Sequence, residues 1–210
     1  MELLPTDALL VTDQQLDVRP GGALAVAEGD SILPGINVLA ARFDHVLLTQ
    51  DWHPRGHISF ASTHGLQPFT DTIEAPYGTQ TLWPDHCIQG TRGAELHPNL
   101  SIPHAELILR KGFRKDIDSY SAFTENDRVT TTGLAAYLQA RGLTRLFFAG
   151  LAYDFCVGFS ALAAAGLGFE SLVIEDLTRA VNLPNTIDAT NAAFAAANVQ
   201  RISSSVLLAS

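Results

Sequence analysis

The segment at residues 145–156 is RLFFAGLAYDFC, and this pattern predicts a buried strand that runs directly into a helix. An uninterrupted apolar run that ends near Gly150 is typical of a covered strand, and the Ala- and Leu-rich run after Asp154 is typical of a helix. Cys156 is therefore expected in the first helical turn. Unpaired backbone N–H groups and the positive end of the helix dipole at that position favour a reactive thiolate. The alternative is an inert cysteine, buried as a small hydrophobic side chain.

Apolar runs alternate with helical patterns along the rest of the chain. Further strands are predicted at 8–12, 45–50, 107–109 and 171–175, with a short last strand within 199–208. Helices are predicted at 32–43, 131–141 and 184–197, in addition to the one that carries Cys156. Each crossover between parallel strands needs a covering helix, so this alternation predicts an α/β fold with a doubly wound parallel sheet. The long connection at 52–103 is expected to be functional, because its Trp, His and Phe content argues against disorder.

The composition favours one globular domain, residues 1–210, that acts on small molecules. With 210 residues and 47% hydrophobic content, the chain can build one well-packed core. Its net charge of −9, from 13 basic and 22 acidic residues, argues against a nucleic-acid or anionic-membrane partner. The N-terminal sequence lacks a signal-peptide pattern, and no apolar run reaches the roughly 20 residues of a membrane span, so a cytoplasmic protein is expected.

Cysteine usage gives little support to covalent cross-links. Cys87 and Cys156 are the two cysteines, and they form no C-x-x-C pair, which argues against a disulfide framework and a thiolate metal site. The sequence leaves the oligomeric state open, and a homo-oligomer is compatible with it.

Four reactive side chains stand at or just after the ends of predicted strands: Asp13, Asp51, Lys111 and Cys156. Ligands of open α/β sheets bind beyond the carboxyl ends of the strands, so these side chains are expected to meet there. Each has an ordinary explanation on its own, as a turn residue, a solvated lysine or a core cysteine. Their joint occurrence indicates a reaction centre.

A second constellation of polar residues suggests a metal site. Asp51 and His53 are two residues apart on an extended segment, His57 follows after a Pro/Gly turn, and His86 lies further on. Mixed nitrogen and oxygen ligands suit a divalent transition metal such as zinc, manganese or iron, with positions left for water or substrate. The alternative is a loop of structural histidines, because D-x-H is a weak pattern.

Five motifs in order carry a resemblance to a known family. They are DQQLD and PGGALAV within 13–26, TQDWHPRGHISFAS at 49–62, WPDHCIQGTRG at 83–93, KG and DSYSAF within 111–123, and DFC at 154–156. From about residue 8 to 180 the chain resembles the nicotinamidase/pyrazinamidase family of isochorismatase-like cysteine hydrolases. The resemblance implies a six-stranded sheet in three α/β/α layers. It also implies hydrolysis of nicotinamide to nicotinate and ammonia in NAD salvage, with pyrazinamide as a further substrate.

The resemblance assigns roles by position. Cys156 is the expected nucleophile, Asp13 the base and Lys111 the cation that stabilises both anions. The expected metal ligands are Asp51, His53, His57 and His86, with zinc as the first choice and iron or manganese as alternatives. Backbone N–H groups of Ala152 and Cys156 are expected to form the oxyanion hole, next to a cis peptide between Leu151 and Ala152. The expected substrate-binding residues are Val18, Leu24, Trp83, Tyr120, Leu151 and Phe155.

Two residues depart from the family pattern. Val18 stands where the family usually has a Phe against the substrate ring, and Phe155 stands where a His or another polar residue is common. Both changes leave the substrate preference open. Two other functions therefore remain as alternatives: a related cysteine hydrolase that acts on a carbamoyl or ureido amide, and a redox or ligand-sensing module that uses Cys87 and Cys156.

Overall fold

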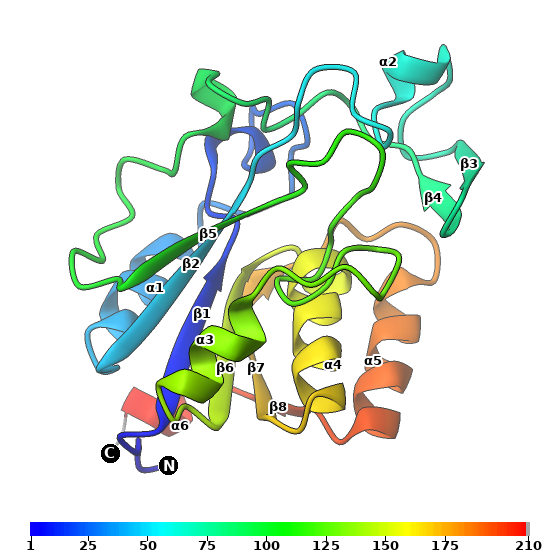
Figure 1. Cartoon of the computed structure of the whole chain (residues 1–210). Helices are drawn as coiled ribbons and strands as arrows, with labels where there is room; N and C mark the ends of the chain where they lie inside the picture. The colour runs from blue at the N-terminus through cyan, green and yellow to red at the C-terminus, as the bar shows by residue number, and fades with distance from the viewer. Residues whose placement is uncertain (209–210) are drawn as a thin grey trace.

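Six parallel strands form the central sheet of the computed structural model, which describes residues 1–208 (Figure 1). The strands are β1 (Asp7–Thr12), β2 (His45–Asp51), β5 (Leu107–Lys111), β6 (Arg145–Leu151), β7 (Glu170–Arg179) and β8 (Gln200–Ile202). Their order across the sheet is β5-β2-β1-β6-β7-β8, and every pairing is parallel. The prediction of a doubly wound parallel sheet is confirmed.

Helices cover both faces of the sheet and create two apolar cores. They are α1 (Leu33–Ala40), α3 (Leu134–Ala140), α4 (Gly158–Gly166), α5 (Thr186–Ala197) and α6 (Ser205–Leu208). Side chains of α1 and α6 belong to one core, and those of α3, α4 and α5 belong to the other. Figure 1 shows these two groups on opposite sides of the strands. Within residues 1–208, no helix has the length and apolar character needed to cross a membrane.

The two cores explain why the strand sequences are apolar without interruption. In β1, Leu9 and Val11 pack on the side of α1, whereas Ala8 and Leu10 pack on the side of α3 and α4. Successive side chains of a strand point to opposite faces, so a strand covered on both faces needs apolar residues at every position. The three layers of the α/β/α sandwich follow from this pattern.

The connection at 52–103 contains regular elements that the sequence pattern does not predict. They are the short helix α2 (Ala61–His64) and an antiparallel hairpin of β3 (Thr72–Ala75) and β4 (Gly78–Thr81). The hairpin lies apart from the central sheet, beyond the carboxyl ends of its strands (Figure 1). Its residues are mostly exposed or half-buried, so it carries no apolar run to reveal it.

The segment after β6 departs from the simple strand-to-helix prediction. A π-helical turn, η3 (Tyr153–Val157), precedes α4 and carries Cys156, so Cys156 lies two residues before the regular helix begins at Gly158. The peptide bond between Leu151 and Ala152 is cis, as the family resemblance implies. This irregular turn sets the direction of the Cys156 side chain at the end of the sheet.

Gly150 of β6 leaves no room for a side chain against the backbone of β1. Its φ is +112°, and a Cβ atom there would lie 2.2 Å from the carbonyl oxygen of Thr12. We expect Gly150→Ala to lower the free energy of unfolding by at least about 3 kcal/mol, because both backbones must shift. Gly142→Ala is the control, since Gly142 also has a positive φ (+70°) but a Cβ atom added to it would meet no atom within 4 Å. It should cost only about 1 kcal/mol. Equal losses in urea unfolding would contradict the steric explanation.

Candidate active site

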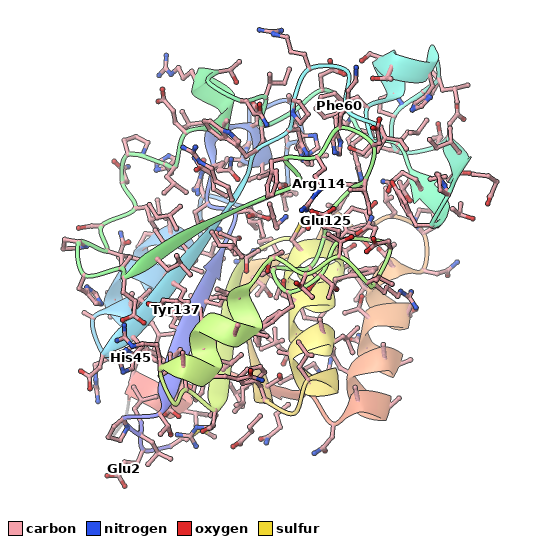
Figure 2. All side chains as sticks on the ribbon, viewed as in Figure 1. Glu2, His45, Phe60, Arg114, Glu125 and Tyr137 are labelled. Carbon is pink, nitrogen blue, oxygen red and sulfur yellow. The ribbon has the colours of Figure 1, made fainter. Side chains whose placement is uncertain are left out.

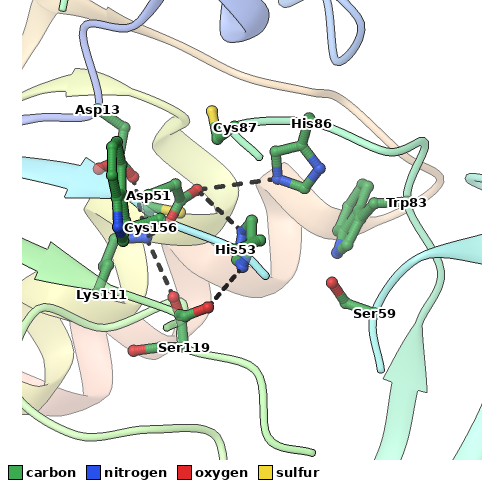
Figure 3. Close-up of polar contacts among 12 residues, drawn as sticks. Asp13, Asp51, His53, Ser59, Trp83, His86, Cys87, Lys111, Ser119 and Cys156 are labelled. Atoms are coloured by element: carbon green, nitrogen blue, oxygen red, sulfur yellow. Dashed lines mark hydrogen bonds and ion pairs between the residues drawn. The ribbon is translucent and has the colours of Figure 1, made fainter. Parts of the chain in front are cut away.

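The carboxyl edge of the sheet brings together the four reactive side chains predicted to meet there. Asp13 follows β1, Asp51 ends β2, Lys111 ends β5 and Cys156 follows β6. The Nζ atom of Lys111 lies 2.5 Å from Oδ1 of Asp51, 3.0 Å from Oδ2 of Asp13 and 3.3 Å from Sγ of Cys156. Figure 3 shows these side chains converging. Lys111 is thus the contact shared by the other three.

Lys111 is almost completely buried, with 1% of its surface exposed. Burial lowers the pKa of its ammonium group, but Asp13 and Asp51 raise it more, so the pKa lies well above its usual range. The carbonyl oxygen of Ser119 accepts a further hydrogen bond from Nζ at 3.1 Å. Lys111 is therefore a fixed positive charge between two carboxylates.

Asp13 is held in one orientation and keeps one oxygen for chemistry. The hydroxyl of Thr49 donates to Oδ1 at 2.5 Å and accepts from the backbone N–H of Asp13 at 3.1 Å. Oδ2 faces Lys111 and forms no aligned hydrogen bond within the described part of the chain. Burial raises the pKa of Asp13, and the charge of Asp51 raises it further. A carboxylate with a raised pKa can accept a proton, and Oδ2 is the oxygen that no aligned hydrogen bond occupies.

Cys156 is close to a proton acceptor but is protected from ionising by its surroundings. Its Sγ lies within 4.8 Å of carboxylate oxygens of Asp13 and Asp51. Burial raises the pKa of the thiol well above its usual value; Lys111 lowers it, and the two carboxylates raise it. The expectation that the helix start alone favours the thiolate is therefore not met, because desolvation and nearby negative charge prevail. The thiol of Cys156 therefore needs a nearby base to take its proton before it can act as a thiolate.

Asp51, His53 and His86 form a compact set of metal-ligand atoms. The Nε2 atoms of His53 and His86 lie 3.8 and 3.9 Å from Oδ2 of Asp51, along the dashed lines of Figure 3. The Nδ1 atoms point away, to the carbonyl oxygens of Gly112 (2.9 Å) and Pro84 (2.8 Å). Metal-binding histidines commonly donate their second nitrogen in this way, which fixes the ring and the tautomer. The donor set fits one divalent metal.

His57 lies beside this set but belongs to a different group, with His53 and Asp118. Its Nδ1 is 2.8 Å from the hydroxyl of Ser59, and its Nε2 is 3.2 Å from the carbonyl oxygen of Ile117. Burial and the nearby His53 lower the pKa of His57 to about 4. The structure therefore brings together three of the four predicted ligands, and the fourth is a neutral imidazole with both nitrogens engaged by protein groups.

Phe60 packs against the three histidine rings. Its ring centroid lies 5.6 Å from those of His53 and His57 and 5.7 Å from that of His86. Figure 2 labels Phe60 among the loops beyond the end of the sheet. Because Phe60 is fully buried, it limits the movement of the rings that carry the ligand atoms.

A small cavity of about 40 Å³ is lined by Asp13 and Cys156 of the reaction centre and by the metal-ligand residues Asp51, His53 and His86. All six residues predicted to bind substrate line it: Val18, Leu24, Trp83, Tyr120, Leu151 and Phe155. Sequence reasoning did not single out four further lining residues, namely Val26, Asp118, Ser119 and Val181. Val26 ends the PGGALAV motif, and Asp118 and Ser119 open the DSYSAF motif, so the motifs were the available signal for these three; Val181 gives no signal apart from being apolar.

Phe155 forms an aromatic wall where a polar residue is common in the family. Its ring centroid is 4.8 Å from Trp83 at an interplanar angle of 90°, and 5.4 Å from Tyr120 at 73°. Edge-to-face contacts of this kind hold rings in defined positions. Together with Val18 on another side, they give the cavity an apolar lining close to a charged reaction centre.

The isochorismatase domain model matches residues 7–204, and the chain belongs to the family that this domain defines. The chain is 53% identical over 202 residues to a nicotinamidase from Acinetobacter baylyi, covering 96% of this chain and 94% of the relative. Within the wider family, it is therefore a member of the nicotinamidase/pyrazinamidase group.

Solved structures agree with this assignment. A nicotinamidase and pyrazinamidase from Acinetobacter baumanii superposes with a TM-score of 0.96 at 51% identity, covering 98% of this chain and 100% of that one. A pyrazinamidase from Pyrococcus horikoshii, solved in complex with zinc, superposes with a TM-score of 0.77 at 31% identity, covering 95% and 99%.

Gly112 provides the space that His53 needs. A Cβ atom at Gly112 would lie 2.4 Å from Cε1 and 2.6 Å from Nδ1 of the His53 ring. We expect Gly112→Ala to displace this ring and to weaken zinc binding at least about tenfold, as measured by competition with a chromogenic chelator. Gly65→Ala is the control, because Gly65 has a similar φ (+67°) and no neighbour within 4 Å. Unchanged zinc affinity in Gly112→Ala would remove His53 from the ligand set.

Proposed function

We propose that this protein is a nicotinamidase, which hydrolyses nicotinamide to nicotinate and ammonia and also accepts pyrazinamide. The observation that carries the proposal is the contact of Lys111 with Asp13, Asp51 and Cys156 at one end of a small apolar cavity. A nucleophile, a base and a charge-stabilising group are what hydrolysis of an amide requires. The similarity to nicotinamidases supports the choice of amide. The reaction belongs to the salvage of pyridine nucleotides.

Proton transfer from Cys156 to Asp13 starts the reaction. Oδ2 of Asp13 takes the thiol proton, and Lys111 stabilises the thiolate through its 3.3 Å contact with Sγ. The thiolate attacks the carboxamide carbon, and the backbone N–H groups of Ala152 and Cys156 are proposed to bind the negative carbonyl oxygen. Asp13 returns the proton to the amide nitrogen, so that ammonia leaves and a thioester remains.

Hydrolysis of the thioester regenerates the protein. Asp13, again a carboxylate, accepts a proton from water while the water oxygen attacks the thioester carbon. The bond to Sγ breaks, nicotinic acid leaves and releases its own proton to water to become nicotinate, and the proton held by Asp13 returns to the sulfur. Lys111 stays charged in both halves of the reaction, because its pKa lies well above its usual range.

Asp51, His53 and His86 are proposed to hold one divalent metal, with zinc favoured by the nitrogen and oxygen donor set and by the zinc complex of a relative. Iron or manganese are the alternatives. Held by these residues, a metal would offer a Lewis-acidic position to the ring nitrogen of the substrate. His57 is hydrogen-bonded to the hydroxyl of Ser59 and the carbonyl oxygen of Ile117 beside this site, and it is not proposed as a ligand.

Loss of the thiol tests the nucleophile. Cys156→Ala should lower kcat for ammonia release from nicotinamide by at least about a thousandfold, because the attacking atom is absent. The fold and zinc content should be unchanged, as checked by circular dichroism and metal analysis. Cys87→Ala is the control: Cys87 is fully buried in the core, so the variant should retain most of the activity. Substantial turnover by Cys156→Ala would show that another group attacks.

Metal removal tests how the ring nitrogen is recognised. Benzamide has the same ring shape and amide as nicotinamide but lacks the ring nitrogen. The metal-loaded protein should prefer nicotinamide by about a hundredfold or more in kcat/KM, since benzamide leaves the metal position unpaired. After treatment with dipicolinate the two rates should converge to a common low value, while iodoacetamide still alkylates Cys156. A persisting preference for nicotinamide would mean that another group reads the ring nitrogen.

A further inference from the structure

A buried glutamine connects the peripheral β3–β4 hairpin to the wall of the cavity. Gln80 is 1% exposed, although Gly78 and Thr79 of the same strand are exposed. Its amide nitrogen lies 2.7 Å from the carbonyl oxygen of Thr81, 2.9 Å from Oδ2 of Asp118 and 3.0 Å from the hydroxyl of Tyr120, so two hydrogens are shared among three acceptors. Asp118 and Tyr120 line the cavity, whereas Gln80 does not. Tyr77, in the turn of the hairpin, adds a second contact, because its hydroxyl accepts the backbone N–H of Asp118 at 3.4 Å.

Donors outside the cavity fix the orientation of the Gln80 amide group. The hydroxyl of Tyr77 and the amide nitrogen of Asn126 donate to Oε1 of Gln80, at 3.0 and 3.2 Å. Asn126 is itself oriented, because its side-chain oxygen accepts the backbone N–H of Tyr120 at 3.0 Å. Since an amide has distinct donor and acceptor ends, these bonds require that the nitrogen of Gln80 faces Asp118 and Tyr120.

The hydroxyl of Tyr120 is held by two donors. It accepts hydrogen bonds from Nε2 of Gln80 at 3.0 Å and from Nε1 of Trp83 at 3.1 Å. These bonds occupy both lone pairs of the oxygen and leave its hydrogen as a donor. They also set the tilt of the Tyr120 ring against Phe155, whose centroid is 5.4 Å away. Without Gln80, the ring keeps only one polar anchor.

We propose that Gln80 is a positioning residue for substrate binding, which acts by holding the Tyr120 hydroxyl next to Asp118. A buried glutamine costs free energy unless its polar atoms are paired, and here two of the three acceptors at its amide nitrogen belong to residues that line the cavity. The residue does not touch the reacting atoms and acts on the position of one wall. The inference rests on the proposed hydrolysis of nicotinamide.

Gln80→Met tests the inference, because methionine has a similar size and shape but forms no comparable hydrogen bonds. We expect KM for nicotinamide to rise about tenfold, with kcat changed less than about threefold, because the wall and not the reaction centre is altered. Thr79→Val is the matched control on the opposite, exposed side of β4, where the hydroxyl of Thr79 donates to Glu74. It should leave both constants unchanged. An unchanged KM in Gln80→Met, with only a lower melting temperature, would overturn the inference.

A double-mutant cycle with Tyr120→Phe identifies the route of the effect. If Gln80 acts through the Tyr120 hydroxyl, Gln80→Met should raise KM less than about threefold in the Tyr120→Phe background. A tenfold rise in both backgrounds would overturn the inference. Should Gln80→Met fail to fold, Tyr77→Phe removes one donor to Gln80 and should raise KM in the same direction but less. No rise in that variant would then overturn it, whereas an inactive wild-type protein would contradict the proposed function instead.

Discussion

The site depends on the burial of one ammonium group, that of Lys111, between two carboxylates. Asp13 and Asp51 come from neighbouring strands, and their charges would repel without the cation at 3.0 and 2.5 Å. Removing one partner of such a buried set leaves an uncompensated charge, which is far more costly than a lost surface ion pair. Asp51 has a second role, because its Oδ2 faces His53 and His86 while its Oδ1 faces Lys111. The reaction centre and the metal-ligand set are therefore one electrostatic unit.

Much of the fold could be predicted, because the strands that carry the site are buried on both faces. An apolar run without alternation has few interpretations, and β1, β2 and β6 follow the predicted ranges to within one residue. The β3–β4 hairpin could not be predicted in this way. Single side chains such as Gln80 connect it to the rest of the chain, and Gln80 is the one buried residue of β4 and is polar. Periodicity contains no information about a contact of that kind.

The candidate site, like the fold, could be predicted from the sequence only in part. Residues at strand ends could be placed together from topology alone, since parallel strands bring their carboxyl ends to one edge. His57 was expected to join the ligands from its spacing in the sequence, but spacing does not reveal that Ser59 and Ile117 engage both of its nitrogens. The protonation of Cys156 was also inaccessible, because it results from burial and from two carboxylates contributed by distant segments. Asp118 belongs to the DSYSAF motif, but the motif does not reveal its hydrogen bond with Gln80 of the β3–β4 hairpin.

The contrast between a charged centre and apolar walls has an evolutionary consequence. The charges of Lys111, Asp13 and Asp51 balance one another. A single substitution at any of the three leaves a buried charge unpaired unless the other two change as well, so these positions do not tolerate single substitutions. Val18 and Phe155 line the cavity with apolar side chains, and exchange between apolar side chains of similar volume usually costs less than about 1.5 kcal/mol of stability. Selection can thus reshape the range of accepted amides one residue at a time, while the chemistry that cleaves them is inherited intact.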